Sequence, residues 1–285
     1  MRPDKNLHVC YALAMDDDPL YADLVTISAL AVARVHPASR ITILTDDATL
    51  ANCGNALRGM RNIAPEIRSV GSFAGDARLR SRFVKTLARS VLTGDFLYLD
   101  ADTLSVSTFD SIFTCEAPIA AAVDRNPVDP AGEFPAWLAP DFDRLDWPQP
   151  TTVYFNSGVV FWKDCKSAHA LGRLWHRNWL HYATTVENPA DQPAFNRSIE
   201  ALGIRPEIMD DAFNFRLGLS PETATGSRIY HFYFGGENKP EGTIIDDLLE
   251  KYRSNGELDF SLIDDGASRG RARRQESCSL LSASS

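Results

Sequence analysis

The sequence predicts an α/β fold with a Rossmann-like, doubly wound and mostly parallel sheet. Short apolar runs alternate with stretches of helical periodicity through the first half of the chain. One apolar run, FLYL at residues 96–99, leads directly into two aspartates. Strands separated by helices connect as right-handed βαβ units, which place helices on both faces of a parallel sheet. In such a sheet, ligands bind just beyond the carboxyl ends of the strands.

The first half of the chain predicts strands and helices in alternation. Apolar runs predict strands at residues 7–14, 41–44, 67–70, 96–99 and 119–123. Apolar residues spaced three or four apart predict helices over residues 21–35 and 77–92. The stripes are Leu24, Ile27 and Leu30 in the first helix, and Leu79, Phe83, Leu87 and Val91 in the second. Residues 126–152 are rich in proline, so we expect a long loop that serves as a lid or a binding surface.

The rest of the chain predicts further elements and then a tail. Strands are expected at residues 159–162, 204–208 and 229–234, and helices at residues 165–182 and 191–202. Residues 264–285 are small and polar with four arginines, which predicts a disordered end. These arginines leave two alternatives: peripheral contact with an anionic membrane surface, or a solubilising tail. We therefore expect one folded unit over residues 1–263, followed by this tail.

Composition excludes several classes of protein. The chain has 285 residues, 44% of them hydrophobic, and a net charge of −9, which is typical of a soluble globular protein and excludes a chain-wide nucleic-acid binder. The five cysteines are scattered and form no C-x-x-C pair, which favours reduced thiols and gives no zinc framework. No apolar run approaches the about 20 residues of a membrane span, and we expect a cytoplasmic protein.

Asp100 and Asp102 follow the FLYL run directly. If the strand continues, residues i and i+2 point to the same side and both carboxylates reach one ligand. Two carboxylates about 5 Å apart repel by roughly 3 kcal/mol at an effective dielectric constant near 20, which a bound divalent cation relieves. The alternative is a solvated strand end, because Asp-x-Asp also occurs at Asp16/Asp18 and Asp141/Asp143.

Several segments together resemble glycosyltransferase family 8 of the GT-A fold, the family of glycogenin and bacterial lipopolysaccharide galactosyltransferases. FLYLDADTLSV is similar to the metal-binding segment of that family, and CYALAMDDDPLYADLVTISAL to its first strand and nucleotide-binding turn. YFNSGVVFW, the Asp191-Gln192 pair and HFYFGGENKP follow in the order of the family. The resemblance covers about residues 7–240 and implies a GT-A fold with a smaller subregion on the acceptor side.

The resemblance implies a set of site residues. Asp100, Asp102 and His231 correspond to the ligands of a divalent cation, Mn²⁺ or Mg²⁺. The alternative for His231 is a packed histidine in an aromatic strand. The residues implied to contact the donor are Leu13, Ala14, Asp17, Lys85, Asp100, Ala101, Asp102, Asp124, Asn156, Ser157, Gly236 and Lys239. Lys239 departs from the family in its spacing from His231, and Glu241 replaces the tryptophan often found after Lys-Pro.

Asp191 and Gln192 are the implied catalytic residues. Asp191 resembles the carboxylate that binds sugar hydroxyls, and Gln192 the group near the anomeric carbon. The alternative for Asp191 is a helix cap. Arg78 and Arg82 compete with Lys85 for the basic donor contact.

The implied activity is transfer of a hexose from a nucleotide-diphosphate sugar, most simply a UDP-sugar, to a hydroxyl of a glycan, glycolipid or protein with retention of anomeric configuration. Two alternatives stay open: a sugar-phosphate nucleotidyltransferase, and a non-catalytic protein of the same fold that binds sugar nucleotides or glycans. A nucleotidyltransferase typically carries a Gly-rich basic signature near the first strand, and MDDDPLY supplies neither feature.

Overall fold

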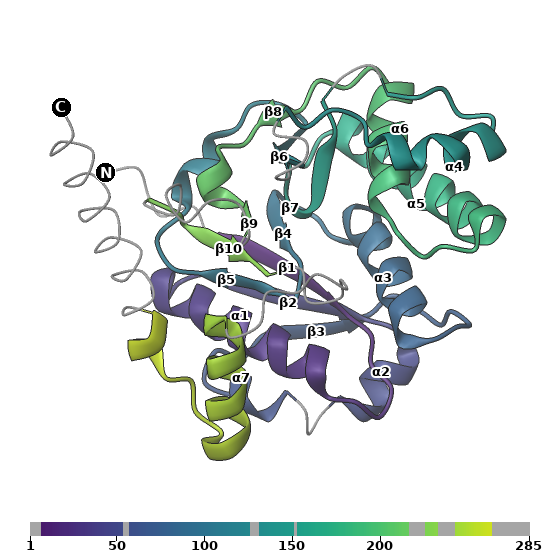
Figure 1. Cartoon of the computed structure of the whole chain (residues 1–285). Helices are drawn as coiled ribbons and strands as arrows, with labels where there is room; N and C mark the ends of the chain where they lie inside the picture. The colour runs from purple at the N-terminus through teal and green to yellow at the C-terminus, as the bar shows by residue number, and fades with distance from the viewer. Residues whose placement is uncertain are drawn as a thin grey trace, which may run out of the picture.

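A seven-stranded sheet with helices on both faces forms the centre of the part of the chain that the structure describes (Figure 1). The structure is a computed structural model that describes residues 7–53, 57–125, 131–150, 153–216, 226–232 and 243–263. The strand order is β3-β2-β1-β4-β7-β6-β8. The strands are β1 (His8–Leu13), β2 (Arg40–Thr45), β3 (Glu66–Ser69), β4 (Phe96–Leu99), β6 (Ile119–Val123), β7 (Phe155–Trp162) and β8 (Glu207–Ile208). All neighbouring pairs are parallel except the two that involve β7, which runs in the opposite direction.

The strands are buried on both faces, as β1 illustrates. Val9, Tyr11 and Leu13 belong to the apolar core on one side of the sheet, and Cys10 and Ala12 belong to the core on the other. Because successive side chains alternate between faces, a continuous apolar run suits a strand covered by helices on both sides.

Helices complete the two layers. They are α1 (Leu20–Val35), α2 (Asp47–Asn52), α3 (Ala77–Val91), α4 (Ala139–Arg144), α5 (Lys166–Val186), α6 (Gln192–Ala201) and α7 (Ile244–Asn255). The helix α1 packs on one face of the sheet, and α3, α5 and α6 pack together on the other (Figure 1). Asp76 caps α3 by accepting a hydrogen bond from the N–H of Leu79 at 2.8 Å, which fixes where this helix begins at the edge of the sheet.

A small three-stranded sheet lies beside α1. Its strands are β5 (Thr103–Ser105), β9 (Phe215–Arg216) and β10 (Ile229–His231), in the order β5-β10-β9. Leu104 and Tyr230 pack in one apolar cluster with Leu24 of α1 and Leu248 of α7. This sheet brings a late segment of the chain to the end of β4.

The predicted doubly wound α/β fold is confirmed, with local differences. The predicted loop at residues 126–152 contains the 3₁₀ helix η3 (Ala136–Leu138) and α4, where Pro140 occupies the first turn and Phe142 is buried. The strand predicted at residues 229–234 is β10 over Ile229–His231, whereas α7 and the other two strands of the small sheet were not predicted. The tail at residues 264–285 lies outside the described residues, so the division into a folded unit and a tail stays a prediction.

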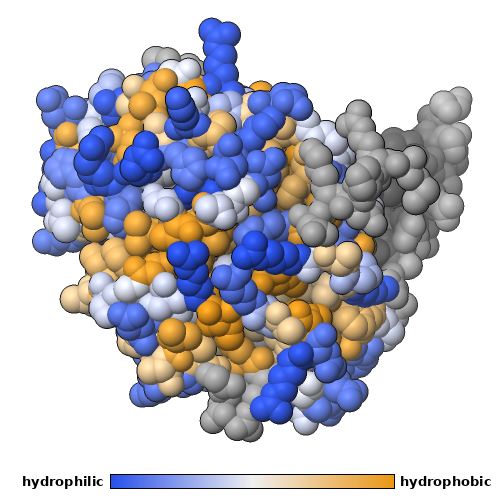
Figure 2. All heavy atoms as spheres, turned by 180° about the vertical axis from the view of Figure 1, so that it is seen from behind, coloured by the Kyte–Doolittle hydropathy of each residue, from blue (hydrophilic) through white to orange (hydrophobic). Residues whose placement is uncertain are grey.

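The surface is mixed in polarity. Figure 2 shows the face behind that of Figure 1, where apolar side chains cross the middle of the molecule in a band broken by hydrophilic ones. Within the described ranges, no helix is long and apolar enough to cross a membrane. Among the described residues, Cys10, Cys53, Cys115 and Cys165 are free thiols.

Candidate functional site

A cavity of about 670 Å³ lies where β1, β4 and β6 end. Its lining includes Leu13 at the end of β1, Asp100 directly after β4 and Asp124 directly after β6. The reversed strand β7 contributes residues near its beginning, and α6 contributes Gln192. This is the edge of the sheet at which the sequence predicted ligand binding.

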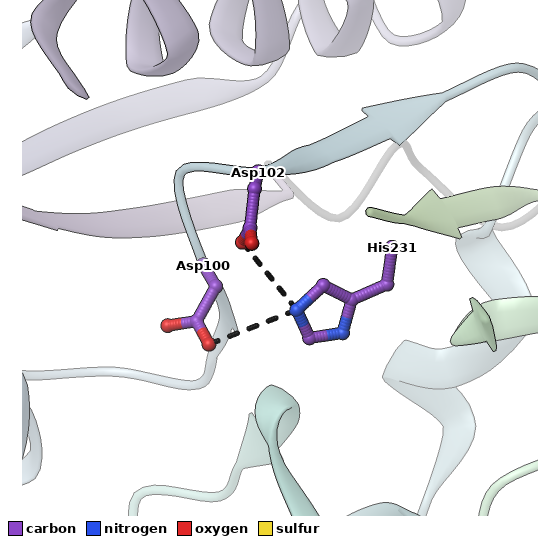
Figure 3. A group of neighbouring side chains, drawn as sticks. All are labelled: Asp100, Asp102 and His231. Carbon is purple, nitrogen blue, oxygen red and sulfur yellow. Dashed lines mark ion pairs between the residues drawn. The ribbon is translucent and has the colours of Figure 1, made fainter. Parts of the chain in front are cut away.

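Asp100, Asp102 and His231 converge at this cavity (Figure 3). His231 Nε2 lies 3.4 Å from Asp102 Oδ1 and 3.9 Å from Asp100 Oδ2. One ligand atom from each residue lies within 4.8 Å of the other two. His231 is buried, whereas the Asp100 and Asp102 side chains are 16% and 14% exposed. Two carboxylates and one imidazole form a donor set that suits Mn²⁺ or a similar divalent ion.

A turn, not a continuing strand, brings the two carboxylates together. β4 ends at Leu99, and β5 begins at Thr103. The Asp100 N–H donates to Gly158 O at 2.7 Å, and Thr103 Oγ1 donates to Asp100 O at 2.8 Å. The strand therefore does not continue through Asp100 and Asp102, but both carboxylates still reach one place, because the turn directs them into the cavity.

The small sheet delivers His231 to the turn. In the antiparallel pairing of β5 and β10, His231 lies opposite Thr103. The Phe232 N–H donates to Asp102 O at 2.9 Å, so the backbone on both sides of the histidine is anchored to this turn. The alternative of a histidine packed only among aromatic residues does not describe this position.

Gly158 leaves the room that the three side chains need. A Cβ atom at this position would lie 2.3 Å from His231 Cε1 and 2.7 Å from Asp100 Oδ2. Real Cβ atoms do not approach other atoms so closely, so a larger residue would push the ring and the carboxylate apart. The donor set and the space around it therefore fit a divalent ion held by Asp100, Asp102 and His231.

The cavity lining is strongly acidic. Of the described residues that line it, seven are aspartates and three are basic, which leaves four net negative charges (3 − 7 = −4). The aspartates are Asp16, Asp18, Asp76, Asp100, Asp102, Asp124 and Asp191, and the basic residues are Arg78, Arg82 and Lys85. A polyanion such as a diphosphate would be repelled here unless a cation bound with it.

Lys85 is buried between two of these carboxylates. Its Nζ lies 3.0 Å from Asp100 Oδ1 and 3.1 Å from Asp191 Oδ2, and its side chain is 1% exposed. Arg82 Nε lies 3.1 Å from Asp191 Oδ1, and Ser157 Oγ donates to Asp191 Oδ2 at 2.8 Å. Burial works to raise the pKa of Asp191, but the Lys85 and Arg82 cations outweigh it, so this pKa lies below its usual value. Asp191 is therefore ionised at neutral pH.

The alternative role of Asp191 as a helix cap is not observed. It precedes α6, but its side chain makes no capping hydrogen bond. Of the competing basic residues, Lys85 and Arg82 both join the network, and Arg78 lines the cavity.

Asp124, Asn156 and Gln192 form a second network of hydrogen bonds. Asn156 Nδ2 donates to Asp124 Oδ1 at 3.3 Å and to Gln192 Oε1 at 3.2 Å, and Gln192 Nε2 donates to Asp124 Oδ2 at 2.8 Å. Asn156 Oδ1 accepts from Gly158 N at 2.8 Å and from Asn214 Nδ2 at 3.0 Å. The structure thus brings the predicted sugar-contacting residues into one fixed cluster beside the three candidate metal ligands.

Four more of the predicted donor contacts differ in where they lie. Leu13, Ala14 and Ala101 line the cavity, but Asp17 is exposed and does not. Its neighbour Asp16 lines the cavity instead.

Arg80 holds the turn after β1, a role that its sequence position did not reveal. Its Nη2 lies 2.8 Å from both Asp16 Oδ1 and Met15 O, and its Nε lies 3.3 Å from Asp46 Oδ2.

The predicted contacts Gly236 and Lys239 lie outside the described residues. Asn214 was also missed, because nothing in its local pattern distinguishes it from a loop residue.

Comparisons with known proteins agree with this architecture. The galactosyltransferase LgtC, solved in complex with donor and acceptor sugar analogs, is similar with a TM-score of 0.56 and 16% identity over 91% of this chain and 96% of that one. The apo-form glycosyltransferase GlyE of Streptococcus pneumoniae TIGR4 is similar with a TM-score of 0.55 and 15% identity over 93% of this chain and 64% of that one. No protein-family model and no curated protein matches the sequence. The chain therefore has the GT-A fold of the glycosyltransferases, as its resemblance to family 8 predicted.

Proposed function

We propose that the chain is a metal-dependent glycosyltransferase that moves a hexose from a nucleotide-diphosphate sugar, with UDP as the nucleotide, to a hydroxyl of a glycan, glycolipid or protein. The observation that carries the proposal is the convergence of Asp100, Asp102 and His231 at the carboxyl ends of the strands of a GT-A fold. The similar galactosyltransferase LgtC was solved with donor and acceptor sugar analogs, which supports a sugar donor and a glycan acceptor here.

Different side chains of the cavity would contact the metal ion and support its ligands when a charged donor binds. When bound, a divalent ion would neutralise the negative charge that grows on a departing diphosphate. Asp100 and Asp102 would supply oxygens and His231 would supply Nε2 for that ion. Lys85 Nζ forms an ion pair with Asp100 Oδ1 at 3.0 Å, and the Tyr98 hydroxyl donates a hydrogen bond to the same oxygen at 2.9 Å. Burial raises the pKa of Tyr98, so this hydroxyl keeps its proton and remains a donor.

The surroundings of the carboxylates disfavour a protein nucleophile, so the retention that the resemblance to family 8 implies would proceed without one. Both oxygens of Asp191 are engaged, one by Arg82 and the other by Lys85 and Ser157. Both oxygens of Asp124 accept from amide groups. Attack by either carboxylate on the anomeric carbon would break these contacts, so a double displacement is disfavoured.

We favour same-face attack for this reason. The acceptor oxygen forms a bond to the anomeric carbon, the bond to the diphosphate oxygen breaks, and the acceptor proton passes to that departing oxygen. Gln192 and Asp124 then bind sugar hydroxyls and hold the ring in place, and Asp191 orients Lys85 and Ser157 at the same wall of the cavity.

Donor hydrolysis tests the proposal. A panel of UDP-sugars is incubated with the chain with and without Mn²⁺, and the same assay is run on Asp102→Asn and on Asp143→Asn. Asp143 belongs to another Asp-x-Asp pair and is exposed, so its variant is the matched control. We expect metal-dependent hydrolysis, a loss of at least about 100-fold in Asp102→Asn, and no loss in Asp143→Asn.

The opposite outcomes identify the alternatives. Full activity of Asp102→Asn would refute the metal assignment. Binding of UDP-sugars with no turnover, even with acceptor glycans added, would favour a non-catalytic binder. Formation of a UDP-sugar from UTP and a sugar phosphate would favour a nucleotidyltransferase.

A further inference from the structure

Asn214 connects His231 to the amide cluster around Gln192. It directly precedes β9 and is 5% exposed. Its Oδ1 lies 2.8 Å from His231 Nδ1, and its Nδ2 lies 3.0 Å from Asn156 Oδ1. One buried side chain therefore contacts both a candidate metal ligand and a candidate sugar contact.

The hydrogen bonds fix the direction of every amide in this chain of contacts. A backbone N–H can only donate, so the Asn156 atom that contacts Gly158 N at 2.8 Å is the carbonyl oxygen. That oxygen also faces Asn214, so the facing atom of Asn214 is the amide nitrogen. The other atom of Asn214, the oxygen, then faces His231 Nδ1, which must carry the proton.

The position of this proton decides what His231 can bind. A neutral imidazole has one N–H and one nitrogen with a lone pair. With the proton on Nδ1, the lone pair of Nε2 points toward Asp100 and Asp102, the direction in which a cation would lie. With the proton on Nε2, the ring would instead donate to these carboxylates and could not bind a metal through that atom.

The two carboxylates by themselves favour the wrong tautomer. Asp102 Oδ1, at 3.4 Å, attracts a proton on Nε2. A hydrogen-bond acceptor at Nδ1 opposes this attraction, and such partners commonly set the tautomer of metal-binding histidines. Asn214 Oδ1 is that acceptor.

We propose that Asn214 is a positioning residue with two functions: its oxygen holds His231 in the tautomer that binds a metal, and its nitrogen holds Asn156 against Gln192 and Asp124. The inference rests on the proposed function, because it assigns Asn214 a role within the same site. Its first function concerns a proton that is present in the metal-free chain and is measurable without any substrate.

Two substitutions separate the functions. Asn214→Leu has a similar size and removes both hydrogen bonds. Asn214→Asp keeps an acceptor for the Nδ1 proton but replaces the amide donor with an oxygen, which repels Asn156 Oδ1. The matched control is Asn178→Leu, because Asn178 Nδ2 donates to Ser198 Oγ at 2.9 Å between α5 and α6, away from the cavity lining.

Metal affinity and the tautomer are measured directly. Free Mn²⁺ is followed by electron paramagnetic resonance during titration of each variant, and nitrogen-15 NMR of the metal-free chain reports which ring nitrogen of His231 is protonated. We expect the Nδ1–H tautomer and Mn²⁺ binding in the unsubstituted chain. We expect a 10–100-fold weaker affinity and a shift toward Nε2–H in Asn214→Leu, as on loss of other partners of metal-binding histidines. Asn214→Asp should keep both the Nδ1–H tautomer and the Mn²⁺ affinity but lose donor turnover through a lower kcat.

Several results would overturn the inference. An Nε2–H tautomer in the metal-free unsubstituted chain contradicts it whether or not the protein transfers sugar. Equal Mn²⁺ affinity in Asn214→Leu and in Asn178→Leu contradicts the first function. Unchanged kcat in Asn214→Asp contradicts the second. Tight Mn²⁺ binding that depends on Asn214, without any sugar transfer, would instead leave the first function of Asn214 standing and would refute both its second function and the proposed function of the chain.

Discussion

Removing the buried cation at Lys85 should destabilise the fold and lower turnover without removing the candidate metal site. In Lys85→Met the side chain keeps a similar length but loses its charge. Asp100 and Asp191 then lose the ammonium group that lies 3.0 and 3.1 Å from them. Because Lys85 is 1% exposed, water cannot replace that group without opening the structure.

The size of the effect follows from burial and from the remaining partners. Removing one member of a buried ion pair typically lowers the free energy of unfolding by about 3–5 kcal/mol. Asp191 retains Arg82 at 3.1 Å, and Asp100 opens to the cavity with 16% exposure, so we expect a value near the lower end. With about 2–4 °C per kcal/mol for a domain of this size, 3 kcal/mol corresponds to a fall in Tm of roughly 6–12 °C.

Thermal unfolding followed by circular dichroism, without metal, measures this loss. The control is Lys251→Met, which removes an exposed pair to Asp259 at 2.6 Å and should change the free energy of unfolding by less than about 1 kcal/mol. Equal Tm shifts for the two variants would refute the conclusion that the burial of Lys85 determines how much its ion pairs contribute to the free energy of unfolding.

Metal binding provides the second readout for Lys85→Met. Loss of a positive charge beside Asp100 should leave Mn²⁺ affinity unchanged or higher, while donor hydrolysis falls because Asp191 and Ser157 lose their common partner. A collapse of Mn²⁺ affinity in the folded variant would show that Lys85 holds Asp100 in its ligating position and does not merely neutralise it.

Three further predictions concern other residues. Gly158→Ala places a Cβ 2.3 Å from His231 Cε1, so calorimetric titration should show loss of Mn²⁺ binding. The free energy of unfolding should fall by about 1–3 kcal/mol. Unchanged Mn²⁺ binding would show that the ring of His231 can move away. The pKa of Asp191 is lowered in the folded chain, so the ionised carboxylate contributes fully to stability above about pH 4, and this contribution is lost as the pH falls through the folded pKa. In urea unfolding, the difference in free energy of unfolding between the unsubstituted chain and Asp191→Asn should therefore shrink below about pH 4. A difference that stays constant with pH would contradict this. Burial, aided by Arg40, lowers the pKa of His8 to about 4, so the free energy of unfolding should fall as the pH drops from 6.5 toward 4, because the unfolded chain takes up the proton first. In His8→Gln the free energy of unfolding should depend less on pH over this range. The same pH dependence in both chains would refute the prediction.

Local patterns in the sequence predicted most of the fold, because strands and helices of a doubly wound sheet are encoded by nearby residues. The FLYL run became β4 with the predicted bounds, and the stripe that contains Phe83 became α3. Of the small sheet, only β10 lies in a predicted strand, at residues 229–234; β5 and β9 were missed, because three and two residues are too few to show a periodicity. These short strands are stabilised by pairing with segments far away in the chain.

The site was predictable to the extent that its residues belong to recognisable segments. Asp100, Asp102 and His231 were identified by resemblance, and their convergence depends on the pairing of β5 with β10. Asn214 could not be identified in this way, because its role consists of two contacts with residues that are distant in sequence. Such a role follows from the tertiary structure and leaves no local pattern.

The chain contains the same Asp-x-Asp spacing three times, and the three pairs differ in the groups that contact their carboxylates. Asp16 pairs with Arg80 at 2.8 Å, and Asp141 accepts from the Tyr182 hydroxyl at 2.6 Å. In these pairs a basic or hydroxyl group of the protein already satisfies a carboxylate.

Asp100 and Asp102 differ in what the fold places beside them. Lys85 compensates Asp100 on one side, and His231, a candidate metal ligand, faces both carboxylates. Among the described residues, Asp100 and Asp102 together with Asp124, Asp191, Lys85 and Arg82 carry a net charge of 2 − 4 = −2, within a described lining that carries 3 − 7 = −4. A divalent cation held by the three donors would reduce this negative charge, so the electrostatics of the cavity and the geometry of the donors favour the same kind of ligand.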